Sequence, residues 1–193
     1  PRIGGVKRDL PVGFADRARA KIKLFENRIN EYEMMLDEST IWLVRLQGVG
    51  YARAEDMVNS GVSGPNVRAA GVNYDVRWAH PYSVYDQVDW EPAVEKPTSV
   101  KGADCYDRYR VRMEEMRQSC KMTLDALDKI PGGANTHYNT GDEMIITKAP
   151  TRAPEGATGF SNYECTRGAS QFYIQGGGDG RGKNPYRLSI RSP

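Results

Sequence analysis

The chain has 193 residues, with 27 Lys and Arg against 25 Asp and Glu, so its formal net charge is only +2. That length suits one domain or a large piece of a bigger one, and the balanced charge argues against nucleic-acid binding, which usually shows a basic stripe. No apolar run approaches the roughly 20 residues that span a bilayer, and no signal peptide is visible. Three widely spaced cysteines, Cys105, Cys120 and Cys165, argue against a disulfide framework and indicate a reducing compartment.

The first predicted element is a helix over residues 15–38. The face of this helix opposite its apolar residues carries charges of both signs, which is more typical of a helix that packs on a protein core than of one that lies on a membrane surface. Residues 40–49 are predicted to be extended or buried, and residues 54–59 to form a short helix that Gly61 ends. Apolar side chains of the first helix recur at steps of three or four and are expected to face the core together: Ile22, Phe25, Ile29, Tyr32 and Leu36.

Residues 61–100 form a loop-rich tract that combines many Gly and Pro residues with several large aromatic rings. Such rings need to be buried, so we expect this tract to be ordered. Long ordered loops are more often functional or interfacial. Gly61, Gly64 and Gly71 are expected to provide positive φ angles for its tight turns.

A long helix is predicted over residues 104–130. Asp104 can cap its start, and Pro131 stops its continuation. The cysteines and methionines on its apolar stripe are interpreted as core residues rather than as redox groups. Glu114 and Glu115, adjacent on the helix, point about 100° apart and are interpreted as surface charges.

Residues 142–191 are predicted to form short strands, with segments at 143–148, 161–166, 171–175 and 186–191. The last two alternate as half-buried strands do. Residues 177–183 imitate a phosphate-binding loop, but Asn184 and Pro185 stand where a hydroxyl ligand and a helix start are required. A glycine-rich hairpin turn is therefore favoured. The fold class predicted from these elements is α+β.

No catalytic centre is evident from the residues themselves. His80 and His137 are far apart, no CxxC or HxxxH spacing occurs, and no nucleophile motif is present. His80, between Ala79 and Pro81, is expected to be a hydrogen-bonding loop residue. We therefore predict no catalytic, cofactor-binding or metal-binding residue in this chain.

Five sets of motifs occur in order: GGV and DLP at 4–11, SGVSGP and RAAG at 60–71, YDVR, HPY and VYD at 74–86, DCYDRY with R and EEMRQS at 104–119, and PYR with IR at 185–191. Together they closely resemble the 49 kDa subunit family of NADH:quinone oxidoreductase, which is respiratory complex I. The resemblance covers nearly the whole chain. It implies a fold like the large subunit of [NiFe] hydrogenases, without the cysteines that hold their metal.

The resemblance further implies a core peripheral-arm subunit that scaffolds the quinone-reduction cavity beside the terminal 4Fe–4S cluster of a partner subunit. NADH and FMN would be bound elsewhere in the complex, this chain would bind no cofactor and show no activity alone, and electron transfer would be coupled to proton pumping. Its partners would be the other core subunits and quinone, with no nucleic acid and no transmembrane segment. The implied location is the matrix side of the mitochondrial inner membrane, or alternatively the cytoplasmic face of a bacterial membrane.

Members of this family are about twice as long, and their quinone-facing residues lie upstream of Pro1. The absence of an initiator Met and the atypical tract 135–157 also depart from the family pattern. Residues 1–193 are thus predicted to be the central to C-terminal part of a 49 kDa-type subunit. They would be either one half of a split subunit whose other half is a separate chain, or a fragment.

Charged residues of the loop tract and the long helix are predicted to be structural or interface residues, because charges brought under an interface must be paired. They would fix the tract against the helix and against neighbouring subunits. Two other functions stay open: a ferredoxin- or deazaflavin-fed quinone reductase or membrane-bound hydrogenase relative, and a purely structural fragment. The candidate residues are Arg68, Asp75, Arg77, His80, Asp86, Asp107, Arg108, Arg112, Glu115 and Arg117.

Overall fold

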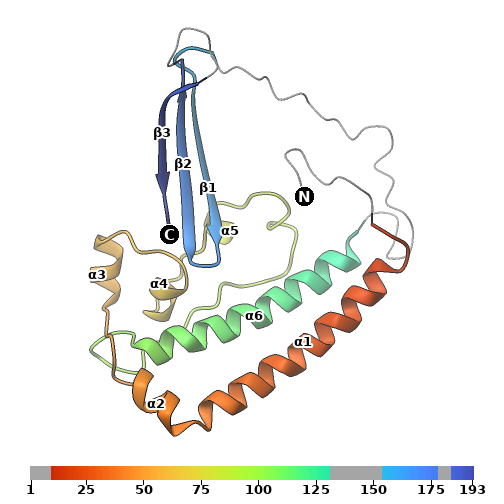
Figure 1. Cartoon of the computed structure of the whole chain (residues 1–193), viewed down its shortest axis with the longest axis vertical. Helices are drawn as coiled ribbons and strands as arrows, with labels where there is room; N and C mark the ends of the chain where they lie inside the picture. Colours follow the sequence, from red (N-terminus) through yellow and green to blue (C-terminus); the bar gives the residue numbers. More distant parts are fainter. Residues whose placement is uncertain (1–9, 131–153, 178–183) are drawn as a thin grey trace.

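The computed structural model describes residues 10–130, 154–177 and 184–193. Within these residues the chain forms helices first and a small antiparallel sheet last, so the α+β prediction is confirmed at that level (Figure 1). The elements are α1 (Phe14–Asp37), α2 (Thr40–Leu46), α3 (Ala54–Asn59), α4 (Pro65–Ala69), α5 (Val76–Ala79), α6 (Cys105–Asp128), β1 (Thr158–Cys165), β2 (Gly168–Gly176) and β3 (Pro185–Arg191).

The two long helices, α1 and α6, lie side by side and antiparallel (Figure 1). Ile29 of α1 packs against Met113 and Cys120 of α6 and is fully buried. Ion pairing joins the helices at one end, where Arg19 lies 2.5 Å from Asp128. Both helices match the sequence predictions to within two residues.

The apolar stripe of α1 is only partly buried, contrary to prediction. Ile22 packs at the edge of the seam with α6, but Phe25 and Tyr32 remain 43% and 48% exposed. The reason is that α6 is the one long element that covers α1 among the described residues, and it contacts only one side of the stripe. A large part of a face predicted to be core is therefore open.

The segment after α1 is also different from the prediction. Residues 40–46 are helical rather than extended, because the Ser39 hydroxyl accepts a hydrogen bond from the Trp42 amide and caps α2. Ile41 and Val44 on this helix are each more than 70% exposed. These apolar side chains of a segment predicted to be extended or buried thus lie on the surface of a short helix.

The start of α6 is fixed by a capping box. The Asp104 side chain accepts from the Asp107 amide, and the Asp107 carboxylate accepts from the Asp104 amide. The same carboxylates reach further along the chain: Asp104 accepts from Gly48 N–H, and Asp107 accepts from Thr98 N–H. Both aspartates are buried.

The loop tract packs against α6 in a second apolar cluster. Val67 and Ala69 of α4 meet Val111 of α6, and all three are nearly inaccessible. The expected positive φ angles occur at Gly61 (71°), Gly64 (75°) and Gly71 (88°). Gly64 also lies against Gly168: a Cβ on Gly64 would lie 2.4 Å from the Gly168 Cα. The tract is ordered, although Trp78, one of its rings, is 53% exposed.

The sheet has the strand order β1–β2–β3, and both pairings are antiparallel. One end lies against α4 and α5, and the other end extends away from the helices (Figure 1). The three later strand predictions are confirmed, whereas the one at 143–148 and most of the glycine-rich turn lie outside the described residues. β3 is not half-buried as predicted: Leu188 and Ile190 are 54% and 58% exposed, because no described element covers either face of it.

Candidate functional site: a buried charge network beside a cationic cleft

Arg68, on α4, lies at the centre of a network of charged side chains. Its guanidinium lies 3.1 Å from Asp75, 2.5 Å from Glu115 and 3.0 Å from Glu164. The side chains of Arg68, Asp75 and Glu164 are at most 3% exposed. A second guanidinium, from Arg77, lies 2.7 Å from Asp75. A guanidinium this deeply buried is tolerated only because its charge is paired and its N–H groups are satisfied.

Four elements bring these groups together. Asp75 caps α5 by accepting from the Arg77 amide, Glu115 projects from α6, and Glu164 belongs to β1. Glu164 also accepts a hydrogen bond from the Val76 amide, while its own amide donates to the Tyr82 hydroxyl. The network therefore fastens the loop tract to the long helix and to the sheet at one point.

The electrostatics are asymmetric, because three carboxylates face two guanidinium groups. Burial, followed by repulsion from Asp75, raises the pKa of Glu164, and Arg68 only partly offsets this. Burial is the largest single influence on the pKa of Arg77 and would lower it, but the hydrogen bond and the charge of Asp75, with the nearby Tyr85 and Glu164, together outweigh it, so the net shift is upward. Arg77 is also held over the Trp90 ring, 4.6 Å from its centroid.

This arrangement suits holding charge and position rather than covalent chemistry. A cavity of about 520 Å³ lies next to the network. Its charged lining residues are Arg68, Arg77, Arg112, Glu115 and Glu164. Among the described residues, no group of His, Cys, Asp and Glu side chains is arranged to hold a metal ion. No described helix is both long enough and apolar enough to cross a bilayer.

The structure unites four of the ten candidate residues, Arg68, Asp75, Arg77 and Glu115, and Arg117 joins α6 to α1 through Glu33. The interpretation of Glu115 as a surface charge is wrong, because it pairs with the buried Arg68. Glu164 was missed, since nothing in its local sequence distinguishes it from any carboxylate on a strand.

The other candidates form no ion pair within the described part of the chain. Asp107 caps α6, and Arg108 donates to the carbonyls of Ala103 and Gly50. His80 is exposed at the end of α5, where its amide bonds to the Val76 carbonyl. Asp86 and Arg112 are exposed. An interface role for these residues stays a prediction.

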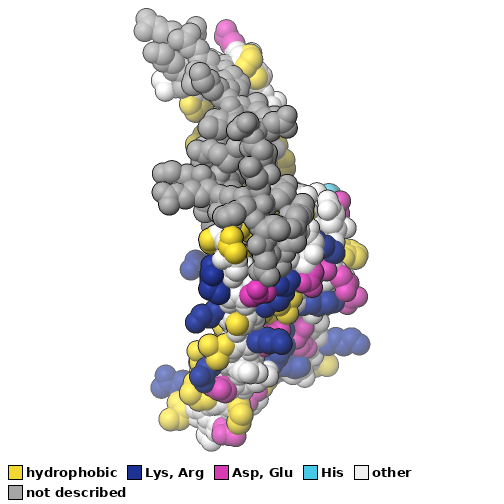
Figure 2. Space-filling model, turned by 90° about the vertical axis from the view of Figure 1, so that its right-hand side faces the viewer, with side chains coloured by type: hydrophobic (Ala, Val, Ile, Leu, Met, Phe, Trp, Pro, Cys, Tyr) yellow, Lys and Arg dark blue, Asp and Glu magenta, His cyan; other side chains and the backbone are white. Residues whose placement is uncertain are grey.

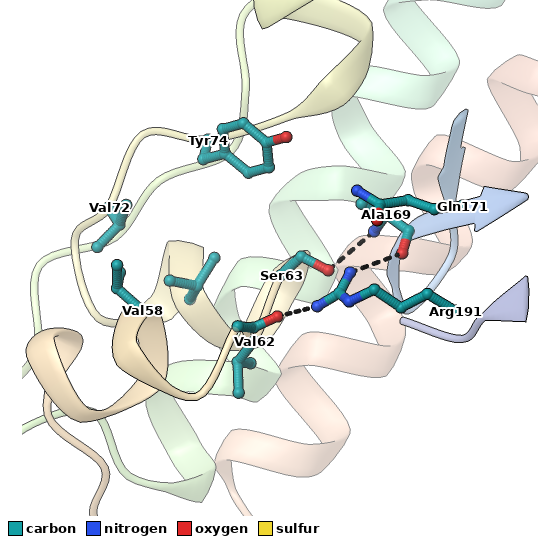
Figure 3. A pocket seen from close by; sticks show the side chains of 10 residues that line it. Val58, Val62, Ser63, Val72, Tyr74, Ala169, Gln171 and Arg191 are labelled. Carbon is teal, nitrogen blue, oxygen red and sulfur yellow. Dashed lines mark hydrogen bonds between the residues drawn. The ribbon is translucent and has the colours of Figure 1, made fainter. Parts of the chain in front are cut away.

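Two further cavities lie where the α3–α4 loop meets the sheet. One, about 460 Å³, is lined mainly by apolar side chains, including Val58, Val62 and Val72 (Figure 3). The other, about 730 Å³, is polar and contains three arginines, Arg112, Arg167 and Arg191. The two share the wall formed by residues 61–63 and Arg191.

Comparison with known proteins identifies the family to which this sequence belongs. The family described as respiratory-chain NADH dehydrogenase, 49 Kd subunit, matches residues 1–193. The chain belongs to this family. The resemblance seen in the motifs is thus confirmed over the whole sequence, which includes the EEMRQS segment that contributes Glu115 to the charge network.

Individual relatives of the 49 kDa family agree. The chain is 36% identical to a subunit of the NAD(P)H-quinone oxidoreductase of Synechococcus sp. (strain JA-2-3B'a(2-13)), covering 100% of this chain and 51% of that protein. It is 39% identical to a subunit of the NADH-quinone oxidoreductase of Syntrophobacter fumaroxidans, covering 100% and 47%. A solved chain of the membrane-bound sulfane sulfur reductase, an archaeal respiratory membrane complex, superposes with a TM-score of 0.72 at 28% identity, covering 93% of this chain and 45% of that one. The chain thus spans about half the length of its relatives.

Proposed function

We propose that this chain is part of the core peripheral-arm subunit of respiratory complex I and forms one wall of the cavity in which quinone is reduced. The family match over residues 1–193 carries the proposal. In this role the terminal iron–sulfur cluster sits on a partner subunit, and NADH and FMN are bound elsewhere in the complex. Electrons pass from NADH to quinone, coupled to proton pumping, and the fold is that of a [NiFe]-hydrogenase large subunit without its metal.

The contribution of this chain is mechanical and electrostatic. A cavity wall next to an electron-transfer site must hold its shape, and the Arg68 network joins α4, α6 and β1 in a single buried cluster. The exposed apolar side chains on α1, α2 and β3 favour packing against other polypeptides. Relatives are about twice as long, so the remainder of the subunit belongs either to a partner chain or to a longer polypeptide of which residues 1–193 are a fragment. The complex would lie at a respiratory membrane, mitochondrial or bacterial.

The test is to purify the complex through an affinity tag on this chain and to assay it for NADH oxidation with quinone as acceptor. We expect a flavin-containing module to co-purify and NADH:quinone reductase activity to follow it. Arg77→Ala should reduce assembly or activity. Isolation of the chain free of any other polypeptide would contradict the proposal, and quinone reduction unchanged by Arg77→Ala would favour a purely structural fragment.

A second function draws support from the superposition on the archaeal sulfane sulfur reductase. The same fold could serve a quinone reductase fed by ferredoxin or a deazaflavin, or a membrane-bound hydrogenase relative. The same preparation separates them. A complex that oxidises reduced ferredoxin or deazaflavin, but not NADH, would replace the first proposal by the second.

A further inference from the structure

The charges of the Arg68 network lie in surroundings unlike those of charges at the surface. On the face of the molecule shown in Figure 2, acidic and basic side chains are interspersed at the surface, where water screens them. The side chains of Arg68, Asp75 and Glu164 are instead at most 3% exposed. Additional polypeptide could only bury these three groups further, so the residues that now contact them determine their charge state.

The network has one negative charge in excess when all of its carboxyl groups are ionised. Asp75, Glu115 and Glu164 are arranged around the guanidinium groups of Arg68 and Arg77. An uncompensated charge in a buried cluster is costly, and a protein usually avoids that cost by a change in the protonation of one group. One bound proton would make the cluster neutral.

The hydrogens of Arg68 lead to the same conclusion. Its Nη1 atom carries two hydrogens, yet three oxygens lie within 3.1 Å of it: the Tyr74 carbonyl oxygen, Glu164 Oε1 and Asp75 Oδ2. The Nε and Nη2 atoms both donate to Glu115. Arg68 therefore cannot give each of the surrounding carboxylates a full set of hydrogen bonds.

The carboxyl group with the fewest donors is that of Glu164. Asp75 accepts three hydrogen bonds from Arg77, one from its amide and two from its guanidinium. Glu115 accepts two from Arg68, and its side chain is 21% exposed to water. Glu164 accepts one from Arg68 and one, at 3.3 Å, from the first amide of α5. Its negative charge is therefore the least stabilised of the three.

The remaining neighbours of Glu164 do not supply the missing positive charge. Arg112 lines the same cavity but forms no ion pair within the described part of the chain, and the Tyr82 hydroxyl bonds to the Glu164 amide rather than to its carboxyl group. Burial and the charge of Asp75 both raise the pKa of Glu164. The charged and titratable side chains around Glu164 are Arg68 from α4, Asp75 and Arg77 from the start of α5, Tyr82 from the next loop, Arg112 and Glu115 from α6, and Cys165 from its own strand.

We propose that Glu164 is a proton-binding site: in the folded chain its Oε2 atom carries a proton, and loss of this proton loosens the joint between β1 and α4. The reaction is an ionisation, in which the O–H bond breaks, the electron pair stays on the carboxylate, and a water molecule takes the proton. Glu164 lines the cavity of about 520 Å³, which has room for such a water molecule. The carboxylate that is left repels Asp75. The inference does not depend on the proposed function.

The direct test is infrared difference spectroscopy on the preparation purified through the tagged chain, as the pH is raised above 4.5, the ordinary pKa of a glutamic acid side chain. A protonated carboxyl group and a carboxylate absorb at different frequencies, so each deprotonation removes a carbonyl band. We expect the wild type to lose one band that Glu164→Gln does not show at any pH. Glu55→Gln, at an exposed position of α3, removes a carboxylate elsewhere and should leave this band in place.

Glu115→Gln determines which group holds the proton. This variant removes one negative charge from the network and keeps Glu164, so the band should remain but disappear at a lower pH than in the wild type. A band that is absent from Glu115→Gln and present in Glu164→Gln would assign the proton to Glu115 and overturn the inference. Identical spectra for the wild type and Glu164→Gln would overturn it as well.

Hydrogen exchange of peptides that cover residues 158–165 tests the joint. After correction for the intrinsic effect of pH, exchange of β1 in the wild type should become severalfold faster as the band is lost, whereas Glu164→Gln should show no such rise. An equal pH dependence in both would contradict the loosening. A Glu164→Gln chain that does not fold would also overturn the inference, because Gln has the size and the neutral charge of protonated Glu. The proposed function is tested separately, by the polypeptides and the NADH:quinone activity that purify with the wild-type chain.

Discussion

The Arg68 network and the three-stranded sheet are joined through Glu164, yet their surroundings are opposite. In the network the charged side chains of Arg68, Asp75 and Glu164 are at most 3% exposed, and each has a partner. On the sheet, side chains as apolar as Ile174, Leu188 and Ile190 share one face and are 45–58% exposed. Buried charge and exposed hydrophobic surface in one chain indicate that the first region is complete and that the second needs a partner.

The largest effect is expected where the complete region is broken. Arg68→Met removes the cation that pairs with three carboxylates, two of them buried, and should lower the free energy of unfolding by roughly 3–5 kcal/mol. Denaturant unfolding measures it. Arg53→Met is the matched control, since its ion pair with Asp56 is exposed to solvent and its loss should change stability far less. Equal effects of the two variants would show that burial of the network is not what matters.

A nearly equal effect is expected at the contact between the α3–α4 loop and the sheet. Gly64→Ala places a Cβ 2.4 Å from the Arg167 carbonyl oxygen, and should cost about 3 kcal/mol or more. Gly156→Ala is the control, because its φ is also positive but its Cβ would meet no described atom within 4 Å. It should cost about 1 kcal/mol. Thermal denaturation of both variants separates collision from backbone strain.

The comparison is sharpened by truncating one apolar side chain in each region. Ile29→Ala opens a cavity in the α1–α6 seam and should destabilise the chain by about 2–4 kcal/mol. Leu188→Ala, on the open sheet face, should change the unfolding free energy by less than about 0.5 kcal/mol. The second variant should instead weaken association with the rest of the complex, seen as loss of partners on affinity purification. A large intrinsic loss at Leu188 would contradict the interpretation of this face as an interaction surface.

The smallest effect is a pH dependence. Because the pKa of Glu164 is raised in the folded state above its ordinary value of 4.5, the folded chain binds this proton more tightly than the unfolded chain. Its contribution to stability is therefore fully present below pH 4.5 and declines as the pH rises through the raised folded pKa. In Glu164→Gln this dependence is absent. The difference in unfolding free energy between wild type and variant should fall with pH above 4.5, and a difference that rises would refute the assigned direction.

Sequence reasoning succeeded where the information is local. The apolar stripe of α6 and its cap at Asp104 depend on residues close together in the sequence. The strands of the sheet could be predicted because turn residues separate them. Sequence reasoning failed where the burial or pairing of a residue depends on a segment far away in the sequence. Phe25 and Tyr32 look like core residues, but among the described elements α6 is the only long one beside them. Glu115 seemed a surface charge, although it meets an arginine 47 residues away. Glu164 gave no signal, since its partners come from α4 and from the start of α5.

The double cap at the start of α6 has a consequence for the order in which the chain folds. Asp104 and Asp107 begin a helix and at the same time receive the amides of Gly48 and Thr98. The hydrogen bonds of the first turn of α6 are therefore complete only after Gly48, 56 residues away in sequence, and Thr98, nine residues away, have reached their places. Helix initiation is ordinarily local, but here the same two carboxylates accept hydrogen bonds from three segments of the chain. The amides of Gly48, Thr98 and Asp107 should therefore exchange with deuterium as one cooperative unit.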